Sequence, residues 1–284
     1  MKIAQIEQLA LDPVKQSYDH RDVILYALGI GYGADPLAEA DLPFVYERDL
    51  HCVPSFANLL CETPFWQKDS AFSIDWQGIL HAEQYFELHR PLPPRGEVWG
   101  FSSIIGIEDK GAGRGALLHQ RRNLVDASSG DVLATIRATM FLRNNGGQGG
   151  FGQSIAPPAP IEGPANDRIL EYATLPGQAL LYRLNGDWNP LHAEPAIARQ
   201  AGFERPILHG LCTQGIACRA ILDAYCEGDP TRLKSMFVRF SRPVMPGETI
   251  RIEFQEESEK SLRFRAIAKE RDLVVLDRCS AELH

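Results

Sequence analysis

Two stretches in the first half of this chain return, in the same order, in its second half. Residues 25–33 (LYALGIGYG) parallel residues 181–189 (LYRLNGDWN), and residues 89–98 (HRPLPPRGEV) parallel residues 241–250 (SRPVMPGETI) with a one-residue gap. The two offsets, about 156 and 152 residues, are so similar that a small change in loop length explains their difference. Two matches in one order indicate an internal duplication, so we expect two related units.

A segment rich in glycine and proline separates the two halves. Residues 146–164 contain little that could pack as a helix or a central strand, so they are predicted to be a linker. The expected units are therefore residues 1–145 and 165–284. A chain of 284 residues is comfortable for two domains, and its 44 % apolar content is enough to bury a core in each.

Strands dominate the later part of each unit. Alternation of apolar and polar residues, as in residues 262–269 (LRFRAIAK), is typical of a sheet with one packed face and one solvated face. Strands are predicted near residues 97–107, 114–126 and 131–143, and again near residues 249–256, 261–271 and 273–283. A helical stretch precedes the strands in each unit, which predicts an α+β fold in which a sheet wraps a central helix.

The clearest helix is predicted to begin at Gly210 and to end near Tyr225. Leu211, Cys218 and Leu222 recur at helical spacing on one face, and small residues between them allow a close approach to a sheet.

Charge and cysteine usage exclude several classes of protein. The net charge is −8 and lysine and arginine form no run, so nucleic acid is not expected as a partner. The six cysteines show no C-x-x-C spacing, which favours reduced thiols in the cytoplasm. No apolar run approaches membrane-spanning length, so no membrane association is expected, and the final four residues (AELH) are not a peroxisomal SKL-type signal.

Residues with catalytic potential gather in the second half. Asp187, Asn189 and His192 lie within six residues of a turn-rich segment, and His209 and Gly210 follow where the helix is predicted to start. An acid and an imidazole can hold a water between a proton donor and a proton acceptor, while the first N–H groups of a helix can stabilise an oxyanion. This combination suggests addition of water to, or its removal from, a thioester-activated carbon chain.

Two motifs carry a family resemblance that covers nearly the whole chain. YRLxGDxNPLHxxP at residues 182–195 and GFxxPILHGLCT at residues 202–213 closely resemble the MaoC-like (R)-specific enoyl-CoA hydratase family, hydratase 2. Residues 21–29 and 81–85 resemble the hydratase part of the peroxisomal multifunctional enzyme of β-oxidation. The resemblance implies a double hot-dog fold, with two hot-dog units in one chain, one active site in the second unit and a homodimer.

The resemblance also implies roles for individual residues. Asp187 and His192 would form the acid–base pair, Asn189 would orient them or the water, and the Gly210 N–H would bind the thioester oxygen. Which member of the pair takes the proton of the water is left open.

The duplication provides an internal control for these roles. Gly31 aligns with Asp187 and Pro36 aligns with His192, so the first unit has no acid–base pair at the matching positions. The first unit is therefore expected to be non-catalytic and to accommodate the acyl chain.

Other residues are candidates for substrate binding. Arg239 and Arg242 could bind CoA phosphates, because a guanidinium binds phosphate in a bidentate manner, although a solvated strand edge would explain them equally well. His209, His81 and Glu47 lie in segments that resemble the functional neighbourhood of the family, and His209 could instead pack beneath the site. No metal is expected, and no cofactor is expected apart from the CoA of the substrate.

The predicted reaction is hydration of trans-2-enoyl-CoA to (R)-3-hydroxyacyl-CoA, and its reverse, on medium to long chains. The alternative within the family is a 3-hydroxyacyl dehydratase that acts on a carrier-protein-bound or branched acyl thioester. A thioesterase is less favoured, because the Asp-x-Asn-x-x-His spacing of residues 187–192 serves addition of water to a double bond. A metal-dependent hydrolase built on His192, His209, His81 and Asp187 is less favoured, because no metal-ligand spacing such as His-x-x-x-His occurs. A non-catalytic acyl-CoA-binding module is the remaining alternative.

Overall fold

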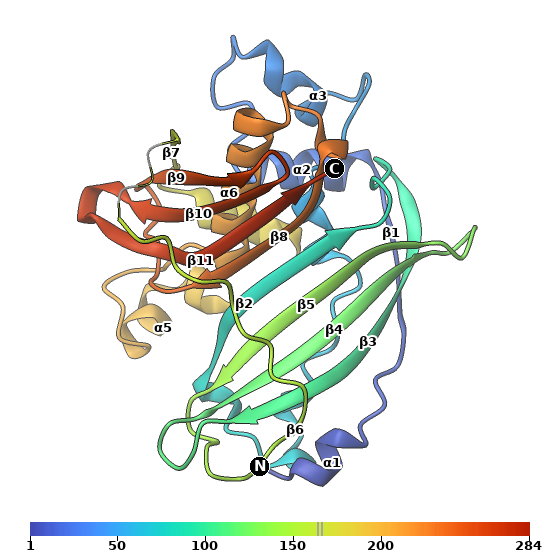
Figure 1. Cartoon of the computed structure of the whole chain (residues 1–284), viewed down its shortest axis with the longest axis vertical. Helices are drawn as coiled ribbons and strands as arrows, with labels where there is room; N and C mark the ends of the chain where they lie inside the picture. The colour runs from blue at the N-terminus through green and yellow to red at the C-terminus, as the bar shows by residue number, and fades with distance from the viewer. Residues whose placement is uncertain (164, 166) are drawn as a thin grey trace.

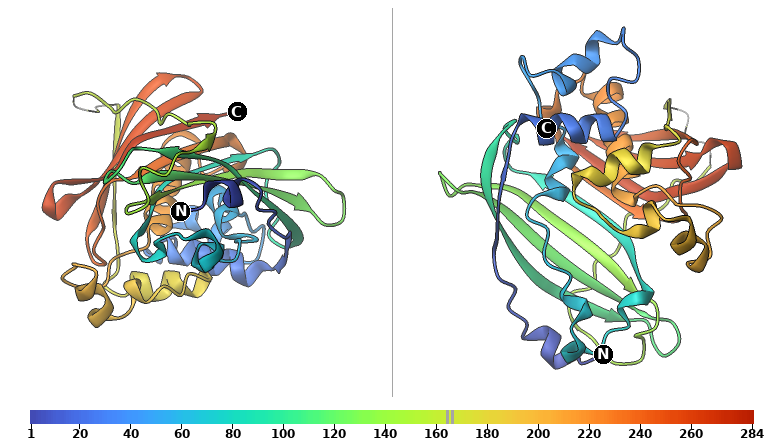
Figure 2. Two further views of the ribbon diagram at one scale, coloured as in Figure 1. Left: turned by 90° about the horizontal axis from the view of Figure 1, so that it is seen from below. Right: turned by 180° about the vertical axis from the view of Figure 1, so that it is seen from behind.

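The computed structural model describes residues 1–163, 165 and 167–284. One antiparallel sheet runs through both halves of the chain, and the longer helices cover one of its faces (Figures 1 and 2). We call the face covered by the helices the inner face and the opposite one the outer face.

The strand order confirms the duplication. The first half contributes β1 (Val14–Tyr18), β2 (Ile79–Leu88), β3 (Gly96–Asp109), β4 (Ala116–Asp126) and β5 (Val132–Leu142), and the second half contributes β7 (Arg168–Ala173), β8 (Leu233–Phe240), β9 (Thr249–Ser258), β10 (Ser261–Ala268) and β11 (Leu273–Leu283). The order across the sheet is β1-β3-β4-β5-β2-β8-β11-β10-β9-β7. From each outer edge to the centre, both halves therefore place their five strands in the same sequence.

The two halves meet where β2 pairs with β8. This pairing runs from Glu83 opposite Arg239 to Glu87 opposite Ser235. The earlier part of β2, down to Ile79, has β5 as a neighbour but lies beyond the pairing with β8. The sheet is thus continuous at the centre but opens on one side of Glu83.

The helices distinguish the two halves. Those of the described residues are α1 (Ile3–Glu7), α2 (His20–Gly29), α3 (Leu42–Val45), α4 (Gln178–Tyr182), α5 (Pro195–Gln200) and α6 (Gly210–Tyr225), joined by short 3₁₀ turns. Helix α6 has the predicted bounds and packs against β7, β8 and β9. The duplication offset places the 3₁₀ turn Pro54–Leu59 opposite the start of α6, so the first unit has a short turn where we expected a second central helix.

The predicted strands are confirmed within a few residues, but four strands escaped prediction. Outside the predicted linker these are β1, β2, β7 and β8, and the short β6 lies within that linker. Both β2 and β8 lie at the centre of the sheet and bury residues on both faces. The adjacent residues Glu83 and Gln84 of β2, for example, are both buried. The two sequences therefore lack the expected alternation of apolar and polar residues.

The predicted linker is only partly irregular. Its residues Phe151–Gly152 form β6, which pairs with β3, whereas Pro164 at its end lies outside the described residues. After β6 the chain crosses the outer face of the sheet (Figure 1), where Arg263 and Arg278 donate to the carbonyls of Ala159 and Pro158, each at 3.2 Å. The linker is therefore fastened to the outer face of the second half.

All six cysteines are free and buried. In the described part of the chain, no helix combines the length and apolar character needed to cross a membrane.

Close packing between α6 and α2 gives a test of this arrangement. A Cβ added at Gly215 would lie 2.5 Å from Cγ2 of Ile30 and 2.8 Å from the hydroxyl of Tyr26. Gly215→Ala should therefore lower the free energy of unfolding by about 1–3 kcal/mol, the usual cost of overpacking, as measured by urea denaturation. The matched control is Gly177→Ala, where nothing lies within 4 Å; equal stability of the two variants would contradict this packing.

Candidate active site

A single cavity of about 820 Å³ connects both halves of the protein. This volume is within the roughly 300–1,000 Å³ of ordinary small-molecule sites. Its lining includes Asp187, His192 and Gly210 from the second half, and residues of β2, β4 and β5 from the first. The expected catalytic residues thus face a space that the first unit helps to form.

The turn that carries Asp187 and Asn189 is shaped by their own side chains. Gly186 precedes it with a φ of +115°, a conformation that favours glycine. Oδ1 of Asp187 accepts from the N–H of Asn189 at 3.1 Å, and Oδ1 of Asn189 accepts from the N–H of Leu191 at 3.0 Å. Asn189 therefore fixes the entry into the 3₁₀ turn Pro190–His192, and both residues line the cavity.

His192 is held in one tautomer by the backbone. Its Nδ1 lies 2.8 Å from the carbonyl oxygen of Ile207, so Nδ1 must carry the hydrogen and Nε2 is left as an acceptor. The residue is 8 % exposed, and burial lowers the pKa of the imidazole below its usual 6.5. His192 is therefore neutral at pH 7 and can accept a proton.

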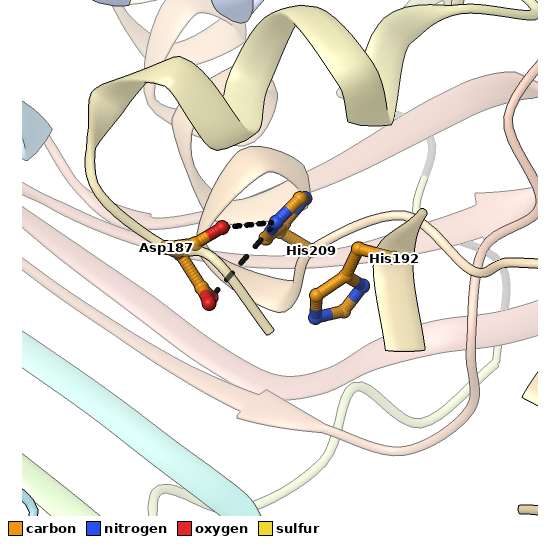
Figure 3. Close-up of side chains that lie close together, drawn as sticks. All are labelled: Asp187, His192 and His209. Carbon is orange, nitrogen blue, oxygen red and sulfur yellow. Dashed lines mark hydrogen bonds and ion pairs between the residues drawn. The ribbon is translucent and has the colours of Figure 1, made fainter. Parts of the chain in front are cut away.

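His209 lies behind this pair rather than in the cavity. Its ring stacks on that of His192 with centroids 3.7 Å apart, and its Nε2 donates to the carbonyl oxygen of Asp187 at 3.3 Å and lies 4.0 Å from the carboxylate (Figure 3). Burial, followed by the nearby His192, lowers the pKa of His209. The side chain is 1 % exposed and does not line the cavity, which agrees with the alternative reading that it packs beneath the site, in contact with Asp187 and His192.

The spacing of the acid and the imidazole suits a shared water. One atom each of Asp187, His192 and His209 lies within 4.8 Å of the others. Two hydrogen bonds of about 2.8 Å, meeting at the angle of a water molecule, span roughly 4.6 Å. A ring nitrogen of His192 and a carboxylate oxygen of Asp187 thus lie within the span that one water can bridge.

Gly210 is the first residue of α6 and lines the cavity. The carbonyl of His209 accepts from the N–H groups of Cys212 and Thr213, which leaves the Gly210 N–H at the positive end of the helix dipole. A Cβ at this position would lie 3.1 Å from the ring of Phe240, so only glycine fits without displacing that ring. The N–H can thus donate to a thioester oxygen.

The cavity continues to the outer face beyond the end of the β2–β8 pairing. Successive residues of a strand point to opposite faces, so Glu83 and Arg239 face outward while Gln84 and Phe240 face inward, yet all four line the cavity. Because β2 has lost β8 as a partner at this point, the opening lies between the two strands.

Positive charge surrounds this outer opening. Arg239 and Arg242 both line it, as expected; Arg239 is 3.9 Å from Asp277, and Arg242 donates to the carbonyl of Ser241. Lys110 and the exposed Arg143 also line the cavity and were missed, because their positions in the sequence give no sign that they lie near β8.

The two remaining candidates fall in different places. His81 lines the cavity, where its Nε2 hydrogen-bonds Oε1 of Gln84 at 2.9 Å and its ring meets Phe240 edge-on; burial lowers its pKa. Glu47 is exposed just after α3 and does not line the cavity. Its expected role in substrate binding is not supported, because no part of it reaches this space.

The acid–base cluster also has the composition of a metal site. Asp187, His192 and His209 could each offer one ligand atom. Imidazole lone pairs lie in the ring plane, however, and the two rings stack 3.7 Å apart with only 27° between their planes. An ion about 2.0–2.1 Å from both ring nitrogens would need to lie close to both planes, so the geometry favours stacking over coordination.

Two family models match different parts of the chain. The model described as "MFE-2 hydratase 2 N-terminal domain" matches residues 16–144, and that described as "MaoC like domain" matches residues 159–278. The candidate catalytic residues all lie within the MaoC-like match.

Individual relatives cover most of the chain. "Enoyl-CoA hydratase 2, peroxisomal" from Arabidopsis thaliana is 39 % identical over 94 % of this chain and 90 % of its own length. "Enoyl-CoA hydratase ChsH3" from Mycobacterium tuberculosis is 36 % identical over 94 % and 93 %. "Peroxisomal multifunctional enzyme type 2" from Mus musculus is 36 % identical over 96 % of this chain, but this chain spans only 37 % of that enzyme.

Solved structures agree with the fold. A MaoC-like dehydratase from Phytophthora capsici superposes with a TM-score of 0.88 at 34 % identity, covering 100 % of this chain and 99 % of that one. A Mycobacterium tuberculosis protein described as a double hot-dog fold gives 0.56 at 15 % identity, covering 97 % of each chain, which bears on the fold alone. The expected double hot-dog architecture is confirmed, and the chain belongs to the enoyl-CoA hydratase 2 family of MaoC-like hydro-lyases.

Proposed function

We propose that the protein adds water to trans-2-enoyl-CoA thioesters to give (R)-3-hydroxyacyl-CoA, and catalyses the reverse dehydration, in fatty-acid β-oxidation. The observation that carries the proposal is the placement of Asp187, His192 and Gly210 around one cavity that also has a basic opening. The carrier-protein alternative is less favoured, because the relatives described above are named for CoA thioesters.

In the proposed mechanism one water supplies both added groups. His192 Nε2 takes a proton from a water held between His192 and Asp187, and the oxygen of that water bonds to C3. The electron pair of the double bond moves toward the thioester carbonyl. The oxygen of this carbonyl becomes negatively charged and accepts a hydrogen bond from the Gly210 N–H. The imidazolium then returns its proton to C2, which restores the carbonyl. Asp187 stabilises the transient imidazolium, and no other reactant is consumed.

The first unit is proposed to be non-catalytic and to hold the acyl chain. Its short turn Pro54–Leu59 leaves the inner face of β4 and β5 open to the cavity, which supports a preference for medium to long chains. Arg239 and Arg242, with Lys110 and Arg143, are proposed to bind the CoA phosphates at the outer opening. These basic side chains line the cavity and would pair with the negative phosphate groups of CoA.

We further propose that the protein acts as a homodimer in the cytoplasm. Free, buried thiols are compatible with a reducing compartment, whereas two relatives are named peroxisomal. Light scattering of the purified protein and fractionation of its host cells test these two points.

Loss of either acid–base residue tests the assigned reaction. Purified protein mixed with trans-2-decenoyl-CoA should consume the enoyl-thioester absorbance and form the (R)-3-hydroxy product on a chiral column. Asp187→Asn and His192→Gln should each lower turnover by about 10²–10⁴-fold without loss of folding. Glu194→Gln, at an exposed carboxylate outside the cavity, is the control. Near-normal turnover by either site variant, release of free CoA thiol, or tight binding without turnover would contradict the proposal.

The proton acceptor can be identified from the pH profile. Because His192 must be neutral and burial lowers its pKa, kcat/KM should stay high in mildly acidic buffer and fall only as the pH drops below 6.5. Asp187 raises the pKa of His192. In Asp187→Asn the acid limb of the residual activity should therefore shift to still lower pH. An unchanged acid limb in His192→Gln would assign the proton transfer to another group.

The reaction is proposed to need no metal. Acid–base chemistry at His192 requires no Lewis acid, and the stacked rings disfavour coordination. Turnover should therefore be unchanged after dialysis against a strong chelator. Loss of activity that Zn²⁺ restores would instead identify Asp187, His192 and His209 as ligands.

A further inference from the structure

The inner end of the cavity contains a buried guanidinium. Arg122 on β4 lines the cavity but is only 8 % exposed. Its Nη2 donates to the carbonyl of Asn58 at 2.6 Å, whereas its Nε has no hydrogen-bond partner among the described residues. Because Nε is enclosed by protein atoms, a group bound in the cavity would meet the Nη atoms of the guanidinium, whose one hydrogen bond among the described residues is that to Asn58.

The charge of Arg122 is balanced at a distance. Within the described residues, Arg122 has no ion pair within 4.0 Å. Glu62 lines the same cavity and raises the pKa of Arg122 against the larger effect of burial. Burial raises the pKa of Glu62, and the charge of Asp187 adds to that rise. The inner end therefore carries one positive and one negative group with a net charge near zero.

The surrounding wall is polar as well. Gln120 lies two residues before Arg122 on the same face of β4, and its Nε2 donates to Oγ1 of Thr63 at 2.9 Å. Asn58 and Gln84, which hydrogen-bond each other at 2.8 Å, also line the cavity. Ile136 and Ala138 on β5 supply apolar surface opposite these groups. A saturated alkyl tail would offer no hydrogen-bond acceptor to the Arg122 guanidinium at this end.

We propose that the preferred acyl group carries an uncharged oxygen, a hydroxyl or a ketone, remote from the thioester, and that Arg122 selects it. This inference rests on the proposed hydratase function and specifies the class of its substrate. An uncharged oxygen is preferred to a carboxylate, because Glu62 lines the same cavity and would repel a second anion there.

The first test compares substrates of equal length. Trans-2-enoyl-CoA thioesters from octenoyl to hexadecenoyl are prepared with a terminal methyl, hydroxyl, ketone or carboxylate group. At the length that reaches Arg122, the hydroxyl or ketone form should exceed the methyl form in kcat/KM by about tenfold, as a hydrogen bond from a charged donor allows. A methyl preference at every length would overturn the proposal, and a carboxylate preference would overturn its uncharged character.

Variants then assign the selection to Arg122. Arg122→Leu should abolish the preference for the oxygenated chain, whereas Arg121→Leu, which alters the exposed neighbour on the opposite face, should retain it. Glu62→Gln removes the compensating charge without altering the buried guanidinium, and should shift the preference toward the terminal carboxylate. Retention of the wild-type preference in both Arg122→Leu and Glu62→Gln would contradict the assignment.

A binding measurement keeps this test independent of turnover. Saturated acyl-CoA molecules with a terminal methyl or hydroxyl group cannot be hydrated, so calorimetry reports only their binding. Tighter binding of the hydroxyl form, lost in Arg122→Leu, supports the selection even if no enoyl thioester is hydrated. Equal binding together with normal decenoyl-CoA hydration would overturn the selection and leave the hydratase function intact.

Discussion

The backbone pairing of β2 with β8 is the interaction on which the rest of the structure depends. It joins two half-sheets of the same strand order into one, and helix α6 packs against the turn Pro54–Leu59 of the first half as well as against β7, β8 and β9 of its own. Five paired positions achieve this, and the pairing stops at Glu83 and Arg239. A longer pairing would close the opening, and a shorter one would separate the acid–base residues from the wall supplied by the first half.

The end of this pairing gives the cavity two chemically different sides. On the outer face Arg239 and Arg242 face solvent, where a polyanion can reach them. On the inner face Gly210 and His192 lie where water is scarce and a hydrogen bond to a developing charge is strong. Phe240 contacts both Gly210 and His81, so the ring forms the narrow passage between the sides. A thioester that bridges the sheet would place its reacting carbon atoms beside the acid–base pair.

The parts that could be predicted from the sequence are those encoded locally. Asp187, Asn189 and His192 lie on one turn, Gly210 starts a helix of regular periodicity, and residues 262–269, mostly in β10, alternate in polarity. Central strands buried on both faces gave no such signal. Arg122 and Glu62 escaped notice because they become neighbours only when β4 packs beneath a turn far away in the sequence. The supporting role of His209 likewise depends on ring stacking, which no spacing predicts.

The 3₁₀ turn Pro54–Leu59, where a second long helix was expected, bears on how many sites one chain can form. Two equivalent units would each enclose a small site beneath their own helix. Here the first unit has a short turn in place of that helix, so both units line one large cavity in place of two small ones. Under the proposed division of roles, duplication gives up one catalytic site per polypeptide and widens the range of acyl shapes that the other site can admit. Such a protein can diversify its substrates by mutation of the first unit while the chemistry in the second stays untouched.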